Sequence, residues 1–179
     1  MLKFEPFCLY GFCVNYPITW KVEIDPLSNR NKGNVAFKSP KNTYIFVSWG
    51  SLKKARKSYS SIDEHVNGVL RDIKKSQGVK KVELILSKPI EINTHKAKLT
   101  HVKLILSRFS ILPFIKTKKS EQEIRSLHLY CDDSERYFVI YGTTTPEKSD
   151  EQGDIFMSMI KSFQCHRQAR EDKISENAA

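Results

Sequence analysis

The chain has 179 residues, of which 40% are hydrophobic and 28% are charged. This length supports one domain whose core needs neither metal nor disulfide, and no segment approaches the roughly 18 consecutive apolar residues of a membrane-spanning helix. The formal net charge of +10, from 30 basic and 20 acidic residues, favours polyanionic partners, although a solvated basic surface explains the same charge.

The first third of the chain predicts short strands. Residues 8–16 are aromatic and β-branched and form one predicted strand, which ends at Tyr16-Pro17. Residues 20–24 alternate between apolar and polar side chains. After a stretch rich in turn-forming residues, residues 35–38 and 44–49 are expected to form a hairpin.

The clearest helix is predicted over residues 61–77. Apolar residues recur there at helical spacing, and Ser61 with Glu64 forms a capping box at the start. Ser76-Gln77-Gly78 ends the pattern. The apolar positions are Ile62, Val66, Val69, Leu70 and Ile73.

The second half returns to strands and closes with another helix. Strands are expected at residues 82–86, 90–92, 98–107, 127–131 and 137–141. Pro89 is expected to break the first of them. An amphipathic helix follows over residues 149–163, with Ser149 and Gln152 as a second capping box. This order predicts an α+β protein with an antiparallel sheet. We expect a single domain over residues 1–165 and a disordered polar tail over residues 166–179.

Three motifs, taken in order, resemble the PsbP-like family over about residues 10–164. They are GFCVNYPITWKV at residues 11–22, Ser61-Ile62-Asp63-Glu64 at the start of a helix, and residues 137–163, where a strand leads to a helix ending in Ser162-Phe163. The resemblance implies an antiparallel sheet with helices on both faces, an α/β/α sandwich. It also implies a fold shared with the Ran-binding Mog-type nuclear transport factor, and membership of a group made up mostly of binding or assembly proteins. None of the family's metal-binding histidines falls on a matching position.

The sequence contains no recognisable catalytic motif. A phosphate-binding glycine loop, a nucleophile elbow and a zinc-protease helix are all missing from it. The acids Asp132, Asp133 and Glu135 lie together where a turn is expected, and turn chemistry explains them. We therefore predict a protein that is not an enzyme and needs no cofactor.

Four cysteines are present: Cys8, Cys13, Cys131 and Cys165. The first residues lack the pattern of a secretory signal, so a cytoplasmic location with free thiols is expected. Buried apolar cysteines are the preferred interpretation, because Cys8 and Cys13 would lie on opposite faces of one strand. Zinc binding with His166 and a disulfide between Cys8 and Cys165 remain alternatives, and no metal site is predicted.

Two segments are candidates for contact with a partner. The first is a basic cluster that follows Trp49 and precedes Tyr59. The second is RFSILPFIKTKK at residues 108–119, whose apolar side chains would protrude if it forms a hairpin tip; two strand ends packed under a helix would explain it equally well. The predicted partner-binding residues are Lys53, Lys54, Arg56, Lys57, Phe109, Ile111, Leu112, Phe114, Ile115, Lys116, Lys118 and Lys119.

The preferred function is a non-enzymatic binding or assembly module that contacts an acidic protein or an anionic membrane surface, the latter as a peripheral contact. The alternative is a nucleic-acid-binding accessory protein, in which basic residues act together with nearby exposed aromatics. A third candidate is a hydrolase or ligand-binding protein with a pocket between sheet and helix.

Overall fold

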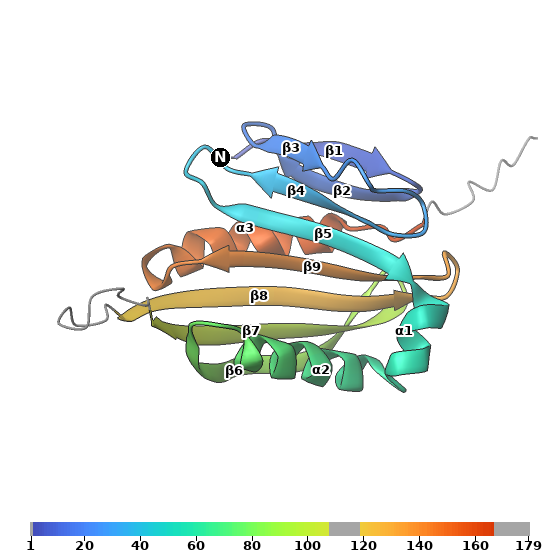
Figure 1. Cartoon of the computed structure of the whole chain (residues 1–179). Helices are drawn as coiled ribbons and strands as arrows, with labels where there is room; N and C mark the ends of the chain where they lie inside the picture. The colour runs from blue at the N-terminus through green and yellow to red at the C-terminus, as the bar shows by residue number, and fades with distance from the viewer. Residues whose placement is uncertain (1, 108–118, 167–179) are drawn as a thin grey trace, which may run out of the picture.

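A seven-stranded antiparallel sheet dominates the computed structural model of the chain, which describes residues 2–107 and 119–166 (Figure 1). A separate two-stranded hairpin consists of β1 (Phe4–Leu9) and β2 (Phe12–Pro17). In sheet order the seven strands are β3 (Lys21–Ile24), β4 (Gly33–Lys38), β5 (Tyr44–Ser51), β9 (Arg136–Thr144), β8 (Lys119–Cys131), β7 (His95–Ser107) and β6 (Val79–Ile92). The predicted α+β class with an antiparallel sheet is confirmed.

Helices cover both faces of this sheet (Figure 1). The first two, α1 (Leu52–Ser58) and α2 (Ile62–Lys75), lie on one face. A short 3-10 turn (Pro146–Lys148) leads into α3 (Ser149–Ser162), which packs on the other face next to β2. This arrangement is the α/β/α sandwich expected from the sequence. In the described part of the chain, no helix combines the length and apolar character needed to cross a membrane.

The main core lies between the sheet, α3 and the β1–β2 hairpin. Phe12, Phe138 and Phe163 meet there, with ring centroids 5.1–5.9 Å apart, and all three are at most 1% exposed. The central strands also bury their other face: Leu127 points into this core, whereas His128 is 1% exposed on the side of α2. Helices on both faces therefore account for the apolar content of β7, β8 and β9.

The start of α2 follows the predicted capping chemistry. The Ser61 hydroxyl accepts a hydrogen bond from the Glu64 backbone N–H at 3.1 Å. The Glu64 carboxylate in turn accepts from the backbone N–H and the hydroxyl of Ser60, at 2.6 and 2.7 Å. These bonds lower the pKa of the Glu64 carboxyl. One orphan donor of the first turn, the N–H of Glu64, is thus satisfied by the predicted cap residue Ser61. The return bond of the Glu64 carboxylate goes to Ser60, one residue before the position that a capping box uses.

The prediction of one strand over residues 8–16 is wrong. The chain turns at Tyr10 and Gly11, whose φ angles of 49° and 86° both lie in the left-handed region. Two such residues give the hairpin turn whose twist matches antiparallel strands. Cys8 and Cys13 consequently face each other across the β1–β2 pair and form a disulfide. Free thiols at these two positions, and a pairing of Cys8 with Cys165, are therefore incorrect.

Two further expectations are corrected by the structure. Pro89 does not break its strand, because β6 is the edge of the sheet and a proline there removes no ladder hydrogen bond from a neighbour. Ser149 and Gln152 do not form a capping box, since Lys148 occupies the cap position of α3. The Ser149 hydroxyl instead donates to the buried carboxylate of Glu123 on β8.

Candidate binding surface and its neighbouring thiol cluster

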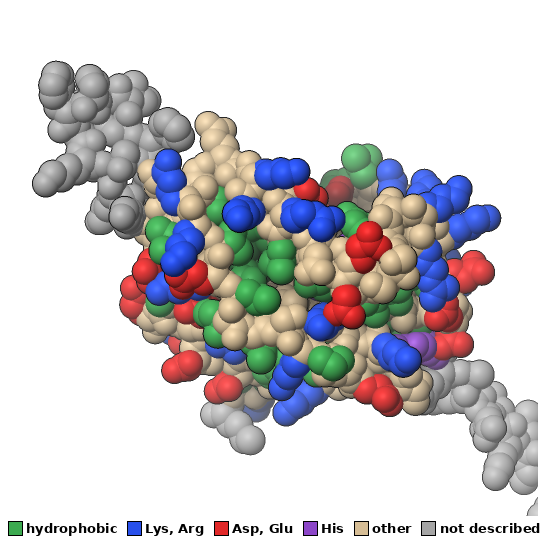
Figure 2. All heavy atoms as spheres, turned by 90° about the horizontal axis from the view of Figure 1, so that it is seen from below, with side chains coloured by type: hydrophobic (Ala, Val, Ile, Leu, Met, Phe, Trp, Pro, Cys, Tyr) green, Lys and Arg blue, Asp and Glu red, His purple; other side chains and the backbone are tan. Residues whose placement is uncertain are grey.

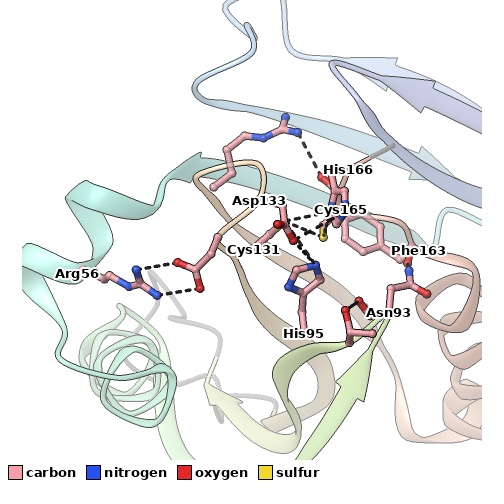
Figure 3. Close-up of polar contacts among 11 residues, drawn as sticks. Arg56, Asn93, His95, Cys131, Asp133, Phe163, Cys165 and His166 are labelled. Atoms are coloured by element: carbon pink, nitrogen blue, oxygen red, sulfur yellow. Dashed lines mark hydrogen bonds and ion pairs between the residues drawn. The ribbon is translucent and has the colours of Figure 1, made fainter. Parts of the chain in front are cut away.

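The most distinctive charged surface lies where β5 runs into α1 and β8 turns into β9. The backbone N–H of Leu52 donates to the carbonyl of Glu135 at 2.9 Å, which joins the start of α1 to the β8–β9 turn. The Arg56 guanidinium then pairs with both carboxylate oxygens of Asp132, at 2.8 and 3.2 Å (Figure 3). Two-point pairing fixes orientation as well as distance. The helix is thus held rigidly at one end of the sheet.

The basic residues Lys53, Lys54, Arg56 and Lys57 are all exposed on α1, whereas Leu52 and Ala55 are buried against Tyr130. These four cations were predicted from the sequence but their helix was not, because two apolar positions are too few to establish a helical period. The segment from Phe109 to Lys118 lies outside the described residues, and of Lys119 only the backbone is described. The prediction that both segments bind a partner stays a prediction.

A hollow of about 680 Å³ opens beside α1. Its described lining includes four basic side chains, Arg30, Lys32, Lys54 and Arg136, and one acidic side chain, Glu135. Arg136 is only 5% exposed and donates to the carbonyl of Cys165 at 3.3 Å, and burial lowers the pKa of its guanidinium. The hollow therefore brings Arg30 and Lys32, from the loop before β4, and Arg136, from β9, close to the cations of α1.

Aromatic residues near α1 do not form an exposed platform. Trp49 is 2% exposed, and its ring nitrogen donates to the carbonyl of Asn29 at 2.8 Å. Tyr59 is half-buried and stacks on His65, with ring centroids 4.7 Å apart. The expectation that these aromatics accompany the basic cluster at the surface is wrong, because both belong to the packing between helices and sheet.

The charge elsewhere is mixed. Figure 2 views the molecule from the side of α2 and β6 and shows Lys and Arg side chains spread over this face, interspersed with acids around a central apolar area. On β6, Leu84, Ile85 and Leu86 are 39–53% exposed beside a register shift in the strand. The net charge of +10 is not collected in one stripe on this face.

A cluster of two thiols and two imidazoles lies directly behind the β8–β9 turn (Figure 3). The sulfurs of Cys131 and Cys165 are 2.9 Å apart, and Nδ1 of His166 lies 3.5 and 3.3 Å from them. Nε2 of His95 lies 3.8 Å from the Cys131 sulfur. The Cys165 thiol donates to Cys131 and thereby lowers the pKa of Cys131, while the pKa of Cys165 is raised. Cys131, Cys165 and His166 were candidates for zinc binding from the sequence, whereas His95 was not.

The third candidate function requires a pocket between sheet and helix, and the space between the sheet and α3 is nearly filled. Its volume is about 10 Å³, lined by β5, β9 and α3 residues that include Ile45 and Phe156. A cavity of this size accommodates about one water molecule. In the described part of the chain, this face of the sheet therefore has no cavity large enough for the ligand-binding or hydrolase function.

Comparisons with solved structures give the fold. Cyanobacterial PsbP (CyanoP) from Synechocystis sp. PCC 6803 matches with a TM-score of 0.60 at 11% identity, covering 92% of this chain and 93% of that chain. The Saccharomyces cerevisiae Ran-binding protein Mog1p matches with a TM-score of 0.59 at 12% identity, covering 92% and 96%. PA94 from Pseudomonas aeruginosa, a putative regulator, matches with a TM-score of 0.52 at 12% identity, covering 92% and 99%.

No protein-family model and no curated protein matches this sequence. The chain nevertheless has the fold of PsbP and Mog1p, so the resemblance predicted from its three motifs is confirmed. Sequence identities this low establish the shared fold but not a shared functional site, because unrelated functions occur on the same fold.

Proposed function

We propose that the chain is a non-enzymatic binding or assembly module that contacts an acidic protein surface through α1 and the hollow beside it. The observation that carries the proposal is the fixed set of exposed cations on α1, held by Arg56–Asp132 and continued into the hollow by Arg30 and Lys32. Cations on a fixed helix need no backbone ordering on binding, and their set spacing favours a partner with complementary carboxylates.

A protein partner also suits the fold. One solved structure with this architecture is described as a Ran-binding protein. A folded acidic surface supplies fixed carboxylates, which match cations spaced along a helix. The apolar and basic residues 109–119 are proposed as a second contact with the acidic partner. If these residues instead contact an anionic membrane surface, the protein would bind membranes peripherally, which is the weaker alternative.

Nucleic acid is the less favoured partner. Binding of single strands relies on aromatic side chains on which bases stack. Trp49 is buried and Tyr59 stacks on His65, so neither offers a free face. The basic residues alone would bind a phosphate backbone only through non-specific, steeply salt-dependent attraction.

The cytoplasmic location expected from the sequence stays a prediction. The disulfide between Cys8 and Cys13 is a bond more typical of oxidising compartments. Counting the thiols of protein taken directly from its native cells would decide this point.

The binding proposal is tested by charge reversal. The triple variant Lys53→Glu/Lys54→Glu/Lys57→Glu is compared with Lys74→Glu/Lys75→Glu/Lys80→Glu, which makes the same charge change at the far end of α2 and the start of β6. Anisotropy of labelled poly-L-glutamate should show binding weakened on the order of tenfold by the first variant and much less by the second.

Two further probes separate the classes of partner. Phosphatidylserine vesicles test the membrane alternative, and a single-stranded oligonucleotide tests the nucleic-acid alternative. Equal losses for the two triple variants would refute α1 as the binding surface. Tighter binding of the oligonucleotide than of poly-L-glutamate at physiological salt would favour the nucleic-acid function.

A further inference from the structure

We propose that His95, Cys131, Cys165 and His166 together bind one zinc ion. One donor atom from each residue lies within 4.8 Å of all the others. A tetrahedral zinc ion with sulfur ligands at about 2.3 Å and nitrogen ligands at about 2.0–2.1 Å places its donors roughly 3.3–3.8 Å apart. This inference does not rest on the binding function proposed above.

The observed separations approach that geometry. Three donor pairs already fall within it: Cys165 to His166 at 3.3 Å, Cys131 to His166 at 3.5 Å and Cys131 to His95 at 3.8 Å. The two sulfurs, 2.9 Å apart, need to separate by a little less than 1 Å. The remaining two pairs, which join His95 to Cys165 and to His166, lie within 4.8 Å and have to close toward the same range.

The donor chemistry fits zinc better than other common metals. Two thiolates and two imidazoles form one of the standard structural zinc sets, and two thiolates neutralise the charge of the ion. Calcium and magnesium require several oxygen ligands, and the Asp133 carboxylate, 3.4 Å from Nε2 of His95, supplies too few. His166 presents Nδ1 to the sulfurs, while its Nε2 lies 3.8 Å from the Asp133 carboxylate. The same carboxylate oxygen lies 3.4 Å from Nε2 of His95. Asp133 is therefore placed to orient His166 from outside the cluster once its carboxylate closes to hydrogen-bond distance of Nε2.

The four ligands are held by features that do not depend on a metal. Cys131 ends β8 and His95 begins β7; their register, Ala97 opposite Leu129, continues by two residues to place His95 opposite Cys131. The Asn93 side-chain amide donates to the carbonyl of Phe163 at 2.5 Å.

Cys165 and His166 are held in place in the same way. Gln164, the residue before them, exchanges two backbone hydrogen bonds with Cys13, at 2.8 and 2.9 Å. Three segments far apart in sequence are thus brought to one point, as a preorganised metal site requires.

A disulfide or a catalytic thiol explains the cluster less well. A disulfide between Cys131 and Cys165 would not require two imidazoles to converge on the sulfurs. A reactive thiolate needs access to substrate, but Cys131 and Cys165 are 0% and 2% exposed. Full coordination by four buried or half-buried protein ligands is the arrangement of a structural zinc site, closed to a substrate.

The ion would connect the end of the folded chain to the β8–β9 turn. Asp132, between Cys131 and Asp133, holds Arg56 of α1 (Figure 3). Zinc binding is therefore expected to stiffen the end of the sheet that presents α1, and to raise the thermal stability of the whole chain because the ion binds only the folded state.

The test uses the full chain, purified under reducing conditions and analysed for metal by mass spectrometry. About one zinc per chain is expected. Substitution by cobalt should give the thiolate-to-metal charge-transfer bands and the strong visible bands of a tetrahedral site. Cys131→Ser should lose the charge-transfer intensity of one thiolate, and His166→Gln should weaken zinc binding at least tenfold.

One further variant controls for the loss of cysteine in general, and a second tests the positioning residue. Cys8→Ser/Cys13→Ser removes two cysteines outside the cluster and should retain one zinc. Asp133→Asn, which alters an exposed positioning residue, should weaken affinity about tenfold without changing the cobalt spectrum.

Four results would overturn the assignment: an absence of zinc at micromolar concentration, a cobalt spectrum unchanged by Cys131→Ser or Cys165→Ser, undiminished zinc affinity in His166→Gln, or a Cys131–Cys165 disulfide in protein purified with zinc present and no reductant.

Discussion

Acidification tests the packing between α2 and the sheet through His128. The ring of His128 is 1% exposed; it lies 3.4 Å from the Ser126 hydroxyl and 5.3 Å, between centroids, from the ring of His65. Its Nδ1 has no hydrogen-bond partner among the described residues. Burial, with the nearby His65, lowers the pKa of His128 from its ordinary value to about 3.

The sign and size of the effect follow from proton binding. The unfolded chain takes up a proton on His128 as pH falls through about 6.5, whereas the folded chain does not until about pH 3. The neutral ring therefore stabilises the fold fully above pH 6.5, and this contribution is lost as pH falls between these values. A shift of this size corresponds to about 5 kcal/mol in total, of which roughly 2 kcal/mol is lost between pH 7 and pH 5.

Urea unfolding followed by fluorescence of the buried Trp20 and Trp49 measures this loss at pH 7 and pH 5. The buffer contains EDTA, so that metal binding contributes at neither pH. His128→Gln should lose about 2 kcal/mol less than the natural chain over this interval, because the titrating groups that do not contact His128 cancel in the comparison.

His101 supplies the matched control. It lies on the opposite face of the sheet, where its ring pairs with the Glu123 carboxylate at 2.7 Å, and His101→Gln should leave the loss on acidification undiminished. If His128→Gln loses as much stability as the natural chain between pH 7 and pH 5, His128 is not held neutral in a dry interior.

Three further predictions concern packing and capping, each measured by urea unfolding at pH 7. Gly68→Ala should cost about 1–3 kcal/mol despite better helix propensity, because a Cβ atom there would lie 2.6 Å from the Tyr59 ring; a smaller cost in a Tyr59→Leu background would confirm the cause, and an equal cost would exclude it. Phe163→Ala should cost about 3–5 kcal/mol, since its ring is fully buried, and a loss below 1 kcal/mol would mean that the ring is not part of the core. Ser61→Ala should cost about 1 kcal/mol, because the N–H of Glu64 loses its acceptor; an unchanged midpoint would show that the cap contributes nothing.

Elements whose signals are local were predictable from sequence. The start of α2 is encoded by Ser61 and Glu64 within one turn of helix, and the alternation in residues 98–107 marks β7. The β1–β2 hairpin was missed because its signal is the pair Tyr10-Gly11, which looks like the interior of an aromatic strand unless both residues adopt positive φ. The effect of Pro89 was wrongly predicted for a different reason. Proline is tolerated in an edge strand, and whether a strand lies at the edge depends on the order of the whole sheet.

The thiol cluster was hidden by distance along the chain. Its ligands come from residues 95, 131, 165 and 166, and only the last two are neighbours in sequence. A usable signal did exist, since His95 follows a predicted turn and Cys131 precedes one. In an antiparallel meander both turns lie at the same end of the sheet. Whether His95 and Cys131 contact Cys165 depends on how α3 packs against the sheet, and no local sequence pattern predicts that packing.

Mapping backbone amide chemical shifts during titration with poly-L-glutamate tests the proposed binding surface most directly. We expect the shifts to concentrate in residues 30–32, 52–57 and 134–137, around α1 and the hollow, and to vanish at high salt. Shifts centred on β6 or on the far end of α2, with α1 unaffected, would contradict the proposal that this end of the sheet receives an acidic partner.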